Sequence, residues 1–157
     1  MNSDSIELLA AFIQENIKYL IVGGYAVSFH AEPRYTKDLD ILIATTHENA
    51  QALYHTLGKF GVPLQDVRPQ DFENQELFFM IGAPPNRIDI LMGIPGVDFE
   101  QAWENRVEAD IDGIPIYYIS RQDLIVSKRA VGRDQDLVDI KALEQAEKLS
   151  QRKNQPE

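Results

Sequence analysis

The sequence of 157 residues contains no cysteine, which excludes disulfide frameworks, thiolate nucleophiles and cysteine zinc sites. Positive charge is also scarce, because 15 lysines and arginines face 25 aspartates and glutamates, for a formal net charge of -10. Nucleic-acid binding depends on neutralising phosphates with Lys and Arg. A broad basic nucleic-acid-binding face is therefore excluded, and any nucleic-acid substrate would need a local patch.

Long hydrophobic runs are absent too, since none approaches the roughly 20 apolar residues that cross a bilayer. The first residues, MNSDSIELLAAF, are acidic where a signal peptide is basic. We therefore expect no membrane association and a cytoplasmic protein. The composition, with 44% hydrophobic and 25% charged residues, is typical of a globular protein. The length predicts one domain over residues 1–150, followed by a polar tail over 151–157.

Hydrophobic periodicity predicts helices and strands that alternate along the first part of the chain. Helices are predicted over 4–16, 25–32 and 46–61, short helical turns over 97–105, and a closing helical region from Ser120. Strands are predicted over 17–22, 37–44, 76–82 and 87–93, with a hairpin over 106–120 and loop or weak structure over 62–76. This order predicts an α/β (α+β) fold, a mixed central β-sheet flanked by helices with C-terminal helices.

Two aspartates interrupt the hydrophobic strand KDLDILIA. In an extended strand Asp38 and Asp40 point to the same side, with Cα atoms roughly 7 Å apart. Carboxylates held this close either take up a proton or are compensated by cations, and Mg²⁺ prefers such oxygen ligands. An isolated pair of this kind is more often an exposed acidic strand face that protects a sheet edge. The pair alone therefore leaves both interpretations open.

The strand RIDILMG repeats the pattern, because Asp89 stands where a core strand would be apolar. If the two acidic strands are neighbours, three carboxylates converge, and such a cluster binds metal for phosphoryl or nucleotidyl transfer. The pair Gly23-Gly24 lies between a predicted strand and a predicted helix. It lets the backbone approach a ligand closely, and the helix N-terminus offers N–H groups to phosphate. A plain strand-to-helix turn is the alternative.

These motifs resemble those of the DNA polymerase beta-type nucleotidyltransferase superfamily, which has a hydrophobic-Gly-Gly motif, a following Asp-x-Asp and a later aspartate on a strand. More narrowly, GGYAVSFHAEPRYTKDLDILI and SRQDLIVSKRAVGRDQDLVDIKAL are similar to minimal stand-alone nucleotidyltransferases related to the toxins of AbiE-type toxin–antitoxin systems. The resemblance spans residues 18–145. Those toxins usually carry a larger helical C-terminal region. The resemblance implies the nucleotidyltransferase fold.

The resemblance also implies two groups of site residues. The catalytic residues, which would also bind Mg²⁺ (or Mn²⁺), are Asp38, Asp40 and Asp89, and Asp89 would help to deprotonate the acceptor hydroxyl. The residues expected to bind the nucleotide are Gly23, Gly24, Arg34, Thr36, Lys128 and Arg133. Lys128 is expected at the triphosphate, with Asp139 orienting Lys128 or Arg133. For Arg129 and Arg133, a solvated helix face paired with acidic neighbours is an equally good interpretation.

The function implied is a Mg²⁺-dependent nucleotidyltransferase that moves a nucleoside monophosphate from an NTP donor to a hydroxyl. The acceptor is left open among a tRNA, a partner protein and a small molecule. A part in a toxin–antitoxin system, with a cognate antitoxin or other partner protein, is a further expectation. Two alternatives are a catalytically silent module that binds a nucleotide or a partner, and a metal-dependent nuclease. The intact acids count against the first alternative, and the glycine pair counts against the second.

Overall fold

The computed structural model describes residues 1–153, and in this range six strands form one mixed sheet. The strand order across the sheet is β3-β4-β2-β1-β6-β5. The strands are β1 (Tyr19–Val22), β2 (Leu39–Ile43), β3 (Phe78–Ile81), β4 (Ile88–Leu91), β5 (Val107–Ile111) and β6 (Ile114–Tyr118). Strand β1 pairs antiparallel with β2 and parallel with β6, while β2 and β4 are parallel. The predicted mixed sheet is confirmed.

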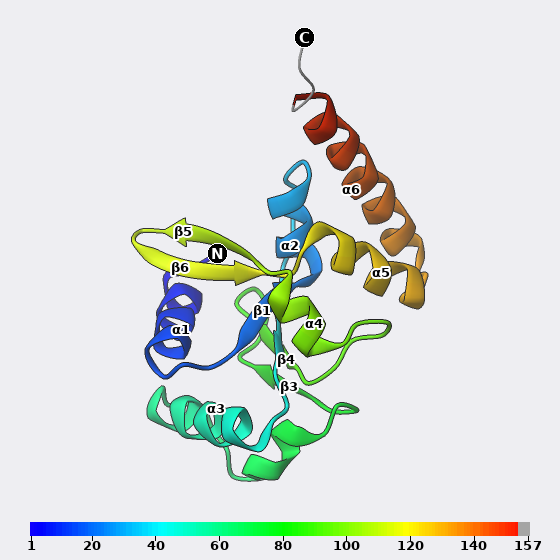
Figure 1. Cartoon of the computed structure of the whole chain (residues 1–157). Coiled ribbons are helices and arrows are strands. Elements are labelled where there is room, and N and C mark those ends of the chain that lie inside the picture. The colour runs from blue at the N-terminus through cyan, green and yellow to red at the C-terminus, as the bar shows by residue number, and fades with distance from the viewer. Residues whose placement is uncertain (154–157) are drawn as a thin grey trace.

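Most of the helices lie in two groups, and α6 extends away from the sheet (Figure 1). Helices α2, α5 and α6 contact one another at one end of the molecule, and α1 contacts α3 and β6. The helices are α1 (Ser3–Gln14), α2 (Gly23–His30), α3 (His47–Lys59), α4 (Phe99–Glu104), α5 (Arg121–Val131) and α6 (Asp134–Lys153), with a 3₁₀ helix, η1 (Pro69–Glu73). No helix among residues 1–153 combines the length and apolar character of a membrane span.

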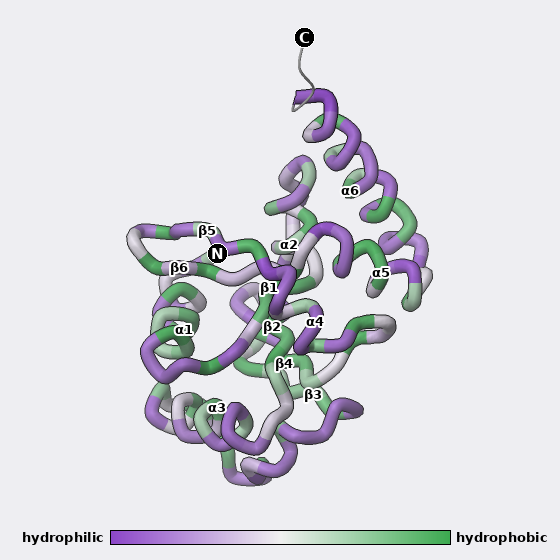
Figure 2. The backbone as a smooth tube through the Cα atoms, in the orientation of Figure 1, coloured by the Kyte–Doolittle hydropathy of each residue, from purple (hydrophilic) through white to green (hydrophobic). Residues whose placement is uncertain are grey.

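The apolar side chains form one buried cluster around the central strands. All four residues of β1 are buried, and Ile41 of β2 and Ile90 of β4 are fully shielded from solvent. Figure 2 shows this hydrophobic centre, with mostly hydrophilic residues along α6. Because β1 and β2 are covered on both faces, they hold the loops at their ends in fixed positions.

Caps and turns confirm two boundaries that the sequence predicts. The Ser120 side chain accepts a hydrogen bond from the Asp123 backbone N–H at the start of α5. The turn between β5 and β6 has positive φ values at Asp112 (53°) and Gly113 (85°). Both residues adopt the left-handed conformation that a two-residue hairpin turn requires.

One expectation about the end of an element needs correction. Helix α6 continues to Lys153, so the first three residues of the predicted polar tail are helical, and 154–157 lie outside the described residues. The segment over 62–76, expected to be loop or weak structure, contains the short η1, in which Phe72 is fully buried and its ring packs edge-on against Phe79. One aromatic anchor thus orders a segment that is otherwise polar. The single domain over residues 1–150 stays a prediction.

Candidate active site

The acidic strands β2 and β4 are neighbours, and their register places Asp40 directly beside Asp89. Asp40 also pairs with Val22 of β1, and Asp89 with Met80 of β3. Cross-strand partners point to the same face of a sheet, so these side chains form a single row. Asp38 lies just before β2. The two acidic strands are therefore neighbours, which is the condition under which the three carboxylates converge.

The carboxyl groups of this row influence one another strongly. Burial, the largest cause, and the negative charges of Asp89 and Asp38 together raise the pKa of Asp40 to about 7. The Arg87 guanidinium opposes this shift, because its positive charge lowers the pKa of Asp40. The pKa of Asp40 thus lies close to neutral pH.

Arg87 lies among the acids, and sequence reasoning assigned it no role. Its Nη2 atom lies 3.2 Å from Asp38 Oδ2 and 3.0 Å from Asp89 Oδ2. The signal was available in the sequence, since Arg87 and Asp89 are two residues apart on one strand and share a face. What the sequence could not give was the neighbouring position of Asp38, which depends on the register of β2 against β4.

The metal site predicted from the three carboxylates stays a prediction. In residues 1–153, no group of three or more His, Asp or Glu side chains is arranged so that it could hold a metal ion. The strands converge as predicted, but Arg87 takes one oxygen each from Asp38 and Asp89. The buried Oδ1 atoms of Asp38 and Asp89 have no hydrogen-bond partner. Carboxylate oxygens in this state suit a hard divalent cation, so the residue types and two free oxygens fit Mg²⁺ or Mn²⁺.

The glycine pair forms the first turn of α2, with no separate loop between β1 and the helix. A Cβ atom on Gly23 would lie 3.0 Å from Asp40 Cγ, and Gly23 has φ of 66°. A Cβ on Gly24 would lie 2.9 Å from Thr36 Cβ. The two glycines thus let the start of the helix lie directly against the acid row and against the segment that holds Thr36.

Lys128 and Arg34 meet at a buried carboxylate of α6. Arg34 Nη2 donates to Asp139 Oδ2 at 3.1 Å, and Lys128 Nζ lies 2.9 Å from the same oxygen and 3.4 Å from Asp136 Oδ1. Lys128 is only 7% exposed, and both aspartates are more deeply buried. The two carboxylates of α6 thus offset the cost of burying this lysine side chain. Of the two partners predicted for Asp139, Lys128 is the one it contacts.

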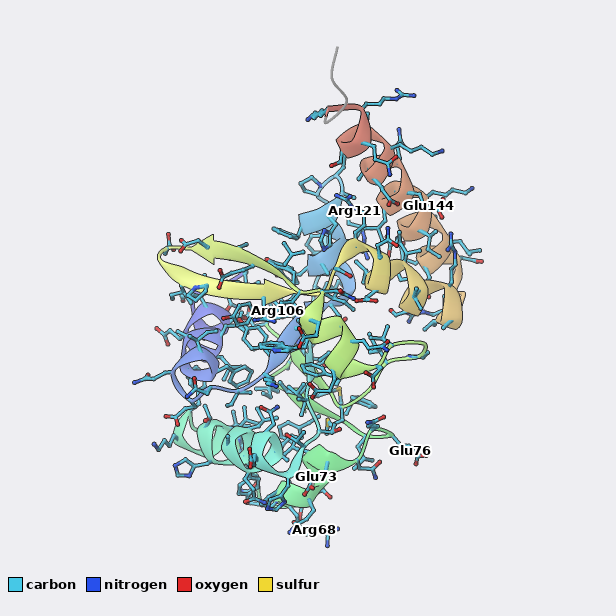
Figure 3. The ribbon with its side chains drawn as sticks, viewed as in Figure 1. Arg68, Glu73, Glu76, Arg106, Arg121 and Glu144 are labelled. Carbon is cyan, nitrogen blue, oxygen red and sulfur yellow. The ribbon has the colours of Figure 1, made fainter. Side chains whose placement is uncertain are left out.

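The other two arginines differ in position. Arg133 Nε donates to Asp136 Oδ2 at 2.9 Å, and this bond raises the pKa of Arg133. Arg129 pairs instead with Glu144 on the outer side of α5 and α6, where Figure 3 labels Glu144. The interpretation as a solvated helix face paired with acidic neighbours is confirmed for both arginines, and Arg133 also lines the cleft described next.

A cleft of about 260 Å³ joins these groups. Its lining residues are Gly23, Gly24, Arg34, Tyr35, Thr36, Lys37, Asp38, Asp40, Lys128, Arg133, Gln135, Asp136 and Asp139. They include all six residues predicted to bind nucleotide and two of the three predicted acids. Asp89 is 8% exposed and lies outside the lining. Pockets for whole ligands usually enclose about 300–1,000 Å³, so the cleft suits the phosphate part of a nucleotide.

Residues 4–153 match a family described as "Nucleotidyltransferase of unknown function" (DUF6036). The chain belongs to this family. The match covers nearly all the described residues, including the acid row and the cleft. It confirms the predicted superfamily at the level of nucleotidyltransferases. The narrower resemblance to AbiE-type toxins stays a prediction.

Solved structures confirm the fold of this nucleotidyltransferase. The lincosamide antibiotic adenylyltransferase LnuA, lincomycin-bound, aligns with a TM-score of 0.58 and 17% identity over 92% of this chain and 96% of that one. ANT(2")-Ia in complex with adenylyl-2"-tobramycin aligns with a TM-score of 0.59 and 16% identity, over 95% of each chain. An antigenic nucleotidyltransferase-like protein from Paracoccidioides brasiliensis aligns with a TM-score of 0.54 and 18% identity, over 93% of this chain and 75% of that one. No curated protein sequence matches the chain.

Proposed function

We propose that this nucleotidyltransferase transfers a nucleoside monophosphate from an NTP to a hydroxyl group, releases pyrophosphate and depends on Mg²⁺ or Mn²⁺. The observation that carries the proposal is the cleft in which the glycine start of α2 and the basic residues Lys128 and Arg133 adjoin the acid row. Phosphates and the acids that act on them would then be adjacent. The acceptor is a tRNA, a partner protein or a small molecule.

The donor triphosphate would bind between α2 and α5. Backbone N–H groups at the start of α2 favour anions, and Gly23 and Gly24 lack the Cβ atoms that would block their approach. Lys128 and Arg133 supply countercharge. Both are paired with acidic side chains of α6, so the phosphates would compete with Asp136 and Asp139 for them. Their ion pairs keep the cations in place before the nucleotide arrives.

The acid row would perform the chemistry. Asp38, Asp40 and Asp89 would hold the divalent ion, which supplies positive charge to the phosphates and makes the acceptor hydroxyl more acidic. The Oδ1 atoms of Asp38 and Asp89 are free of Arg87, so they can bind an ion while Arg87 holds the Oδ2 atoms. Asp89 would accept the proton of the hydroxyl. A place in a toxin–antitoxin system, with an antitoxin as partner, belongs to this proposal.

Replacement of the acids tests the proposal. We expect Asp38→Asn and Asp40→Asn to lower the release of pyrophosphate from NTP in Mg²⁺ by roughly 100-fold or more, because each loses a charged oxygen ligand. The measurement is pyrophosphate release and transfer of label from each α-phosphate-labelled NTP to a cell lysate and to purified RNA. Circular dichroism checks the fold, and the exposed Asp66 gives the matched control Asp66→Asn.

Three results would contradict the proposal. Full activity in the Asp38→Asn and Asp40→Asn variants would show that the acids are not the catalytic groups. NTP binding without turnover against every acceptor would favour the silent binding module. Release of nucleotides from RNA or DNA in the absence of NTP would favour the nuclease.

A further inference from the structure

The acid row continues beyond Asp89 onto an exposed apolar edge of the sheet. Met80 is the cross-strand partner of Asp89, and Phe78 shares its face two residues away. Met80 is 52% exposed and Phe78 is 61% exposed. The donor cleft lies on the opposite side of the acids, where Gly23 follows β1. The row therefore leads from the donor side through Asp40 and Asp89 to this apolar edge.

This order matters for the direction of attack. In phosphoryl transfer the attacking oxygen and the leaving oxygen lie roughly in line. If pyrophosphate leaves on the side of Gly23 and Lys128, the hydroxyl enters from the side of Asp89. The surface beyond Asp89 on that side is Met80 and Phe78 (β3 in Figure 1). The acceptor should thus contact the edge strand β3.

The backbone of β3 is also free to bind another strand. Met92 N–H donates to Leu77 C=O at 3.4 Å, so Leu77 and Met92 form a hydrogen-bonded pair of the antiparallel ladder. Because the two kinds of pair alternate, the N–H and C=O groups of Phe78 and Met80 point away from β4. Among residues 1–153, no backbone group bonds to them from outside the sheet. We call Phe78, Met80 and these outward groups the β3 edge.

An extended polypeptide fits the β3 edge better than a nucleic acid does. Edge strands usually carry charges, prolines or bulges that prevent strand addition. The two exposed side chains of β3, Phe78 and Met80, are instead apolar. Exposed Glu76 lies just before the strand (Figure 3), and the chain carries a net charge of -10. These charges repel a phosphate backbone. An added strand gains main-chain hydrogen bonds and places alternate side chains on the face of the acids.

We propose that the β3 edge binds an extended segment of an acceptor protein, and that a tyrosine of this segment receives the nucleoside monophosphate. The proposal rests on the function proposed above. Neighbouring strands lie about 4.8 Å apart, so the residue opposite Met80 would lie about 10 Å from Asp89 at the Cα atoms. Serine and threonine hydroxyls are too close to their own backbone to span this gap. A tyrosine hydroxyl lies beyond its ring, which can pack on Met80 and Phe78.

The transfer balances without any further reactant. The phenol oxygen attacks the α-phosphorus and forms a new O–P bond. The bond from the α-phosphorus to the oxygen that bridges to the β-phosphate breaks, and pyrophosphate leaves with that electron pair. The phenol proton passes to a carboxylate of the acid row, of which Asp89 is nearest to the β3 edge. The product is a tyrosyl nucleoside phosphodiester.

Two variants of the β3 edge test the proposal. Met80→Pro removes the outward N–H and replaces the long methionine side chain by a short ring, while the hydrogen bonds to β4 come from other residues. Phe78→Ser removes apolar surface alone and serves if Met80→Pro fails to fold. Val138→Ser on α6 is the control, since Val138 is 60% exposed and lies outside the cleft and the β3 edge.

The probes are randomised peptides of about eight residues with one central tyrosine, long enough to form a strand. The same mixture with phenylalanine replacing tyrosine, and purified tRNA, form the other arms. With α-phosphate-labelled NTP we expect label on the tyrosine mixture only. We expect the two edge variants to reduce that label about tenfold or more, which corresponds to about 1.4 kcal/mol, and the control to retain it. Pyrophosphate release to water should stay unchanged in the control variant Val138→Ser, which lies outside the cleft and the β3 edge.

The outcomes separate this proposal from the one on which it rests. Equal labelling by the edge variants, labelling of the phenylalanine mixture, or labelling of tRNA alone would overturn the tyrosine acceptor. If no NTP yields pyrophosphate, the transferase function fails instead. Hydrogen exchange at the Phe78 and Met80 amides then decides the binding part without catalysis. The tyrosine mixture should slow exchange at both amides, and unchanged exchange would exclude strand addition.

Discussion

Asp40 is the residue of the acid row whose pKa the fold clearly shifts. Burial is the largest cause of its raised pKa, followed by the charges of Asp89 and Asp38. Since the pKa is about 7 in the folded protein and 3.8 without these effects, the folded state binds more protons than the unfolded state between these values. Stability from this group is therefore present at low pH and is lost as pH rises through this window.

A pH series tests this linkage. With chelator present, we expect the free energy of unfolding of the wild type to fall relative to that of Asp40→Asn as pH rises from about 4 to about 7. The amide of the variant does not ionise, so its repulsion with Asp89 and Asp38 is absent at every pH. Urea unfolding at each pH gives the difference, with Asp66→Asn as the control. Parallel curves for the wild type and Asp40→Asn would show that Asp40 keeps an ordinary pKa.

At the scale of the element, the start of α2 is fitted closely to the acid row. We expect Gly24→Ala to destabilise the protein by about 1–3 kcal/mol, because the added Cβ overlaps Thr36 and neighbouring atoms must move to accommodate it. Gly23→Ala should cost more, since it adds strain at positive φ to a clash with Asp40. Thermal unfolding and pyrophosphate release should both detect the change.

Gly113→Ala is the matched control for this comparison. Gly113 has φ of 85° and nothing within 4 Å of its added Cβ, so this variant measures the cost of backbone strain alone. We expect that cost to be about 1 kcal/mol without loss of activity. If Gly23→Ala lowered the stability no more than Gly113→Ala does, the close fit between α2 and Asp40 would not contribute to stability.

The elements show what the sequence could and could not predict. Alternation of apolar residues predicted the strands that carry Asp40 and Asp89, and turn residues predicted the hairpin at Asp112 and Gly113. Both depend on local spacing. The exposed edge position of β3 was not predicted, because strand order is a long-range property. Nor was the ion pair of Arg87 with Asp38, which requires the parallel register of β2 and β4.

At the scale of the whole molecule, the site combines three distant parts of the chain. The segment of Gly23 to Asp40, the strand of Asp89 and the helices of Lys128 and Asp139 meet only after folding. The family resemblance predicted these residue types, but not that Asp139 also bonds Arg34. Local cations offset much of the acid charge at the cleft, while the molecule as a whole keeps a net charge of -10. Metal binding must therefore be separated from general screening of this charge.

Thermal unfolding at pH 8 makes that separation, because Asp40, with a pKa of about 7, is then largely ionised. A ligand at roughly 100 times its Kd stabilises the folded state by about 2.7 kcal/mol, and each kcal/mol raises Tm by roughly 2–4 °C in a chain of this size. We expect MgCl₂ to raise the Tm of the wild type by about 5 °C or more over NaCl of equal ionic strength. Asp38→Asn should lose this excess and keep the response to NaCl, since screening acts on all exposed charges. An equal rise in both salts would mean that Mg²⁺ acts only by screening, and that the carboxylates of Asp38, Asp40 and Asp89 do not bind it in the absence of NTP.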